Sequence, residues 1–104
     1  MDRTVDIYLI KETIAYDSIG QPIPTQTERN VFAQLRSITR AEWFEAGRNG
    51  LRPDISFVMN ALDYDGEKVI KWDNNYYGIY RTFLARNNMI ELYCEKKGGL
   101  VNGS

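Results

Sequence analysis

The stretch from Tyr76 to Glu95 constrains the fold more than any other part of the chain. It contains two runs rich in aromatic and β-branched residues, 76–84 and 89–95, separated by a short polar break with two consecutive asparagines. Residues of these types favour strands, and asparagine favours tight turns. The stretch therefore predicts a β-hairpin.

The two runs differ in how their apolar residues are distributed. In 89–95 the residues Ile90, Leu92 and Cys94 alternate with more polar ones, which is typical of a strand with one buried face. The run 76–84 is apolar on both faces: Tyr77, Ile79 and Phe83 on one, Tyr76, Tyr80 and Leu84 on the other. Such a strand is either central in a barrel or covered by a partner, and the pattern leaves both options open.

Alternation and turn residues predict the remaining strands at 4–15, 28–36, 54–62 and 68–72. Their inward sets are Val5, Ile7 and Leu9; Val31, Ala33 and Leu35; and Ile55, Phe57, Met59 and Ala61. A loop with two prolines is expected at 17–24, a tight turn at 63–66 and another turn at 73–75. The chain is thus predicted to be mainly β: a small six- to seven-stranded barrel or sandwich with one short helix and a long loop.

One helix is predicted at residues 40–46. The segment Thr39-Arg40-Ala41-Glu42 matches a capping box, in which the Thr hydroxyl and the Glu carboxylate satisfy free backbone donors. Gly47 is expected to end the helix because glycine tolerates the left-handed conformation. A basic loop, 48–53, then leads to the next strand.

A chain of 104 residues is expected to form one domain, here 1–97, followed by a flexible tail at 98–104. No apolar run approaches the roughly 20 residues that cross a bilayer, and we expect neither a secretory signal nor a membrane association. Cys94 is the single cysteine, so an internal disulfide is excluded, which fits a reducing compartment.

The charge balance and the absence of histidine bear on function. The 13 Lys and Arg are matched by 14 Asp and Glu, which disfavours a protein whose task is to grip nucleic acid. Without histidine the commonest general base and metal ligand is missing. The segment 63–66 lacks the ligand pattern of a calcium loop, and Cys94 fits a core residue better than a nucleophile. We predict no enzyme, and no catalytic, cofactor-binding or metal-binding residues.

The candidate binding residues are aromatic and basic residues of the helix, of the loop after it and of the closing hairpin. Trp43 and Phe44 project about 100° apart, so one core cannot easily bury both. Either Trp43 is buried with Phe44 partly exposed, or the pair anchors a partner. The candidate assembly interface or channel loop comprises Trp43, Phe44, Arg48, Asn49, Gly50, Leu51, Arg52, Tyr76 and Tyr80.

Several segments together carry a family resemblance. They are the loop Tyr16-Asp17-Ser18-Ile19-Gly20, the segment from Val31-Phe32-Ala33-Gln34 to Trp43-Phe44-Glu45-Ala46-Gly47, the strand Ile55-Ser56-Phe57-Val58, and the closing hairpin with Tyr77-Gly78-Ile79-Tyr80-Arg81-Thr82-Phe83 and Ile90-Glu91-Leu92-Tyr93. In these segments the chain resembles the head-closure proteins (head–tail joining or head–tail connector proteins) of long-tailed bacteriophages and prophages.

The resemblance implies a small barrel whose copies form a ring, a hexamer or dodecamer, beneath the portal and its adaptor. The partners would be portal, adaptor and tail-completion proteins, with passing DNA contacted at most non-specifically. The loop after the helix, carried over as 47–54, would point toward the channel and help to retain packaged DNA. The expected location is the head–tail interface of the virion, and the host cytoplasm during assembly.

A second function is kept as an alternative. A small barrel could bind single-stranded nucleic acid by stacking bases on Tyr76, Tyr80 and Tyr93. An enzyme is the least favoured class because no acid, base or metal set is recognisable.

Overall fold

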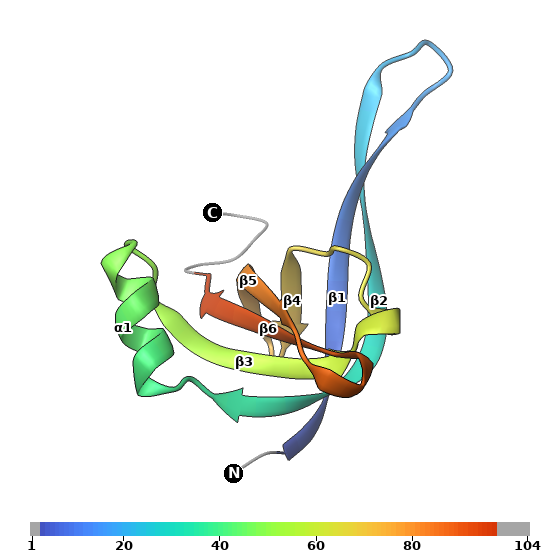
Figure 1. Cartoon of the computed structure of the whole chain (residues 1–104). Helices are drawn as coiled ribbons and strands as arrows, with labels where there is room; N and C mark the ends of the chain where they lie inside the picture. Colours follow the sequence, from blue (N-terminus) through green and yellow to red (C-terminus); the bar gives the residue numbers. More distant parts are fainter. Residues whose placement is uncertain (1–2, 98–104) are drawn as a thin grey trace.

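Six antiparallel strands close into a barrel in the order β1-β2-β3-β6-β5-β4 in the computed structural model, which describes residues 3–97 (Figure 1). The strands and the helix are β1 (Arg3–Tyr16), β2 (Pro22–Ser37), α1 (Arg40–Arg48), β3 (Pro53–Asn60), β4 (Val69–Trp72), β5 (Asn75–Leu84) and β6 (Met89–Lys96). Two short 3-10 turns lie at Ala61–Asp63 and Arg86–Asn88. The predicted mainly β barrel with one short helix is confirmed. The tail predicted at 98–104 lies outside the described residues.

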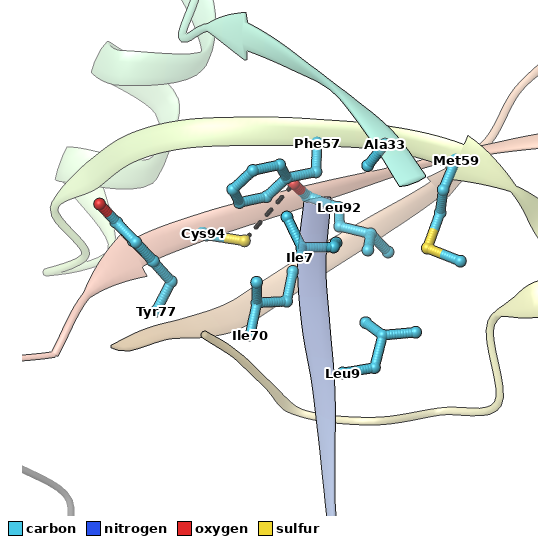
Figure 2. Close-up of a cluster of buried hydrophobic side chains, with 9 residues drawn as sticks. All are labelled: Ile7, Leu9, Ala33, Phe57, Met59, Ile70, Tyr77, Leu92 and Cys94. Atoms are coloured by element: carbon cyan, nitrogen blue, oxygen red, sulfur yellow. Dashed lines mark hydrogen bonds between the residues drawn. The ribbon is translucent and has the colours of Figure 1, made fainter. Parts of the chain in front are cut away.

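The inward side chains of all six strands form the core shown in Figure 2. Its members are Ile7, Leu9, Ala33, Phe57, Met59, Ile70, Tyr77, Leu92 and Cys94. Phe57 packs edge-on against Trp72 and Tyr77, with ring centroids 6.0 and 6.2 Å away. Burial of Cys94, with a smaller effect from the charge of Asp54, raises the pKa of its thiol to about 12. Cys94 is therefore a core residue, as predicted.

Two asparagine-containing turns create the predicted hairpins. Asp73 and Asn74, between β4 and β5, have positive φ angles of 53° and 62°. Asn87 and Asn88, between β5 and β6, have φ angles of 61° and 59°. Asn and Asp tolerate this left-handed region better than other residues, because their short polar side chains bond locally.

A bulge in β5 overturns one of the predicted faces. Ile79 lies opposite Cys94, but Arg81 lies opposite the next residue of β6, Tyr93, so Tyr80 is an extra residue. An insertion of one residue moves the following side chains to the other face. Phe83, predicted to share the inward face of Ile79, is therefore 52% exposed.

The β1–β2 hairpin is longer than predicted, since β2 begins at Pro22 and not at residue 28. The two strands pair continuously as far as Tyr16 and Pro22, whereas β4 joins β1 over Tyr8–Ile10 and β3 joins β2 over Gln34–Ser37. The outer part, residues 11–28, is a two-stranded ribbon that projects from the barrel (Figure 1) and is called the arm below.

The turn at the tip of the arm spans 17–21 and not 17–24. The Asp17 carboxylate accepts hydrogen bonds from the amides of Ile19 (3.0 Å) and Gln21 (2.8 Å). Pro22 and Pro24, expected in the loop, lie in β2. No strand among the described residues borders this edge of β2, and proline is tolerated on such an edge because no ladder bond is lost.

The connection from β3 to β4 is a crossover and not the tight turn predicted at 63–66. β3 ends at Asn60, so Ala61 belongs to a 3-10 turn and not to the strand predicted to reach residue 62. β3 pairs with β2 and β6, while β4 pairs with β1 and β5, so residues 61–68 cross from one side of the barrel to the other.

Candidate assembly interface

Helix α1 starts as predicted but ends later. The Thr39 hydroxyl accepts a hydrogen bond from the Glu42 amide (3.1 Å), which caps the first turn. Gly47, predicted to end the helix, lies inside it, and Asn49 is the C-terminal cap. The left-handed residue is Gly50 (φ +80°), and the amide after it, that of Leu51, bonds back to the Ala46 carbonyl at 3.0 Å.

The Glu42 carboxylate bonds to the barrel and does not close the predicted capping box. It accepts hydrogen bonds from the Tyr80 hydroxyl (2.7 Å) and from the Arg81 guanidinium, both on β5. Partial burial would raise the pKa of Glu42, but the hydrogen bonds from Arg81 and Tyr80 outweigh it and hold this pKa below its usual value. Glu42 thus fastens α1 to β5.

Trp43 and Phe44 both lie on the outer side of α1. Their side chains are 55% and 57% exposed, and their rings meet edge-on with centroids 5.3 Å apart. Together with Ile38, Thr39 and Arg40 they line a shallow hollow. The buried residue of the helix is Ala46. The structure therefore excludes the interpretation in which Trp43 belongs to the core.

The basic loop is shorter than predicted. Arg48 is the last residue of α1 and Pro53 the first of β3, so the connection contains only residues 49–52. The Arg52 amide donates to the Glu95 carboxylate (3.3 Å), and Arg48 pairs with Glu45 (3.4 Å). Of the candidate loop residues, Arg52 is thus bonded to β6, whereas the amides of Asn49, Gly50 and Leu51 bond back to the last turn of α1.

The two candidate tyrosines lie in different places. Tyr80 packs beside Tyr93, with ring centroids 6.5 Å apart, and its bond to Glu42 ties it to α1. Burial, the bond to Glu42 and the charge of that carboxylate raise the pKa of Tyr80. Tyr76 lines a second hollow, at the root of the arm, and the Lys71 ammonium stands 5.9 Å from the centroid of its ring. The structure brings Tyr80 to the helix but leaves Tyr76 apart from it.

Sequence reasoning missed a buried carboxylate near the root of the arm. Glu67 is 3% exposed; it accepts a hydrogen bond from the Arg29 guanidinium (2.8 Å) and another from the Asp65 amide (2.9 Å). Burial would raise the pKa of Glu67, but the bond from Arg29 leads the contacts that hold it below its usual value. Glu67 lies in an irregular connection, where no periodic pattern marks a residue as buried.

Two kinds of feature are absent from residues 3–97. In this range no group of three or more His, Cys, Asp and Glu side chains is arranged to hold a metal ion. Within the same range, no helix has the length and apolar character that a membrane span needs.

Comparison of the chain with protein-family models, with curated proteins and with solved structures found no match.

Proposed function

We propose that this chain is a structural subunit of a phage head–tail connector. In this role its copies form a ring, dock under the portal–adaptor complex, help to retain packaged DNA and offer a surface to the tail. Two features support the proposal: the resemblance carried by the helix segment and the closing hairpin, and the closed barrel with one short helix that this resemblance implies. The protein would then belong to the virion and, before that, to the host cytoplasm.

The rigid presentation of Trp43 and Phe44 is the observation that carries this proposal. Large aromatic side chains outside a core are typical of the anchors that dominate protein–protein interfaces. Because Glu42 bonds to Tyr80 and Arg81, the helix that bears them is held in one position on the barrel. A preordered anchor loses less conformational entropy when a partner binds.

The charge of the chain suits a subunit that surrounds DNA without gripping it. The formal net charge is -1, and Arg48, the last residue of α1, already pairs with Glu45. Strong phosphate binding would slow the passage of DNA, so a nearly neutral subunit fits a channel wall. The short 49–52 connection is bonded to Glu95 of β6 through Arg52. This favours a loop that lines the channel over a long loop that plugs it.

Light scattering on the portal–adaptor complex of the phage or prophage that encodes this chain tests the proposal. The expected result is an added mass equal to six or twelve copies of the chain. No added mass at micromolar protein would contradict the proposal. For the alternative function, the measurement is the quenching of tyrosine and tryptophan fluorescence by single-stranded DNA: stacking predicts quenching that weakens as salt is added.

A further inference from the structure

One face of the arm is apolar along its outer half. Residues directly opposite each other in a ladder share a face, and faces alternate along each strand. Ile14 lies opposite Pro24 and Tyr16 opposite Pro22, so these four side chains share one face. Ile14 is 55% and Tyr16 69% exposed. A two-stranded ribbon gains no core from such residues, which points to a partner.

The same face is acidic toward its root. Glu12 lies opposite Gln26, two positions nearer the barrel than the Ile14–Pro24 pair. Glu28 lies opposite Ile10, four positions nearer the barrel than that pair. The arm, residues 11–28, contains three acids, Glu12, Asp17 and Glu28, and one cation, Lys11, which already pairs with Asp65. A partner of the arm should therefore be apolar and basic.

The apolar face continues into the hollow at the root of the arm. This hollow has a volume of about 510 Å³. Its wall is partly apolar and carries charges of both signs: Ile10, Val69 and Tyr76, with Lys68, Lys97, Glu12 and Glu67 among the charged residues. The volume lies within the roughly 300–1,000 Å³ of natural ligand pockets. Cations on an apolar wall attract aromatic faces, so the hollow suits aromatic side chains of a partner.

The outer face of α1 has the complementary properties. It carries the exposed Trp43 and Phe44, and Arg40 lines the hollow beside them. Gly47 is four residues after Trp43 and three after Phe44, which places it between them on this face. The apolar Trp43–Phe44 pair beside Arg40 therefore complements the apolar face of the arm beside Glu12 and Glu28.

We propose that the arm and the root hollow of one copy bind α1 of a second copy, with Trp43 and Phe44 on the apolar face and Arg40 near Glu12 and Glu28. Arm and α1 lie on opposite sides of the barrel (Figure 1), so a copy does not reach its own helix. A contact between two different faces is head-to-tail, and it forms a ring where the rotation closes. This inference rests on the proposed function, because it names the contact that joins neighbouring ring subunits.

Disulfide trapping between two variants of the full chain, each with one exposed cysteine added to the buried Cys94, tests the contact. Gln26→Cys places a thiol on the proposed face of the arm, and Gly47→Cys places one in the aromatic face, where a Cβ meets no atom within 4 Å. Both variants keep all the proposed apolar anchors. Mixed under a glutathione redox buffer, they should give a mixed disulfide dimer in at least about tenfold excess over either homodimer.

Control cysteines on the opposite faces of the arm and of α1 test which faces are in contact. Thr27→Cys lies next to Gln26 but on the other face of the arm, and Glu45→Cys lies on the far side of α1; each should reduce the mixed dimer about tenfold. Wild-type protein should not cross-link, because Cys94 is buried. Melting curves of all variants check that each one is folded.

Equal yields with the control positions, a dominant arm–arm homodimer, or no mixed dimer would each overturn the inference. If the chain binds the portal–adaptor complex but this cross-link does not form, the inferred contact is wrong and the proposed function stands. If the cross-link forms but the complex is not bound, the proposed function fails and the contact between copies stands.

Discussion

At the scale of single residues, Glu67 is a buried charged side chain whose ionisation should affect stability. Its carboxylate is buried against Arg29, and its pKa in the folded protein lies below the unfolded value of about 4.3. A group with a lowered pKa stabilises the fold above its unfolded pKa, and this stabilisation is lost as the pH falls toward the folded pKa. The contribution of Glu67 should therefore be complete at pH 7.

We expect Glu67→Gln to lower the free energy of unfolding at pH 7 by about 1–3 kcal/mol, because the charged partner of Arg29 is lost. The difference from wild type should shrink as the pH falls from about 4.3 toward the lower folded pKa, because protons then bind the unfolded chain more readily than the folded one. Urea denaturation at pH 7 and at pH 3 measures both effects. Asp65→Asn, in the exposed pair with Lys11, is the control and should change little. A constant difference at both pH values would contradict this explanation.

Glu42 is the second residue whose role the structure defines, since it fastens a helix of nine residues that is too short to be stable alone. In Glu42→Ala the bonds to Tyr80 and Arg81 are lost, and the amides of α1 should exchange with deuterium at least about tenfold faster. Barrel amides should keep their rates. Glu45→Ala, on the solvent side of the same helix, serves as the control, and equal effects of the two variants would show that Glu42 is not the fastening residue.

At the scale of elements, the sequence predicted the features that follow from alternation along a strand. It missed the features that depend on which strands lie side by side. Alternation located the six strands and the core positions Phe57, Leu92 and Cys94. It could not reveal that β2 starts at Pro22. Proline fits a strand only at a free edge, and the sequence does not show which edges are free. It could not locate the bulge at Tyr80, which exposes Phe83, since a single inserted residue leaves no mark in composition.

The candidate site shows the same division. That Trp43 and Phe44 cannot share one core followed from helical geometry, and both side chains are exposed. The bond from Glu42 to β5 was missed because it joins residues 38 and 39 positions apart, which a local capping pattern does not report. Alternation placed Tyr76 and Tyr80 on one face of the strand, but the bulge at Tyr80 breaks that alternation, and Tyr76 lines the hollow at the root of the arm.

The charge pattern of the arm leads to a prediction about two elements at once. If Arg40 of one copy faces Glu12 and Glu28 of another, Arg40→Glu should weaken self-association about tenfold or more, because like charges would then meet. The double variant Glu12→Arg/Glu28→Arg should weaken it as well. A mixture of the two variants should associate like wild type, which sedimentation velocity at low salt measures. Failure of the mixture to regain association would argue against this pairing of charges.

At the scale of the whole molecule, the barrel and the aromatic pair on α1 should be separable, because Trp43 and Phe44 contribute nothing to the core. Trp43→Ala/Phe44→Ala should therefore keep the fold. Exposed substitutions usually change stability by less than about 0.5 kcal/mol each, so the melting temperature should fall by only a few degrees. Phe57→Ala, which empties the centre of the core, should instead cost about 3–5 kcal/mol.

Assembly should respond in the opposite way to the same double variant. As the proposed anchors, Trp43 and Phe44 should dominate binding, so Trp43→Ala/Phe44→Ala should remain folded yet add no mass to the portal–adaptor complex and restore no infectivity. Leu62→Ala, which removes a side chain that is 85% exposed elsewhere on the surface, is the matched control and should assemble normally. Thermal melts beside light scattering and infectivity separate the two effects. A folded double variant that still assembles would show that the aromatic pair is not an interface, and the neighbour contact proposed for the arm would lose its counterpart.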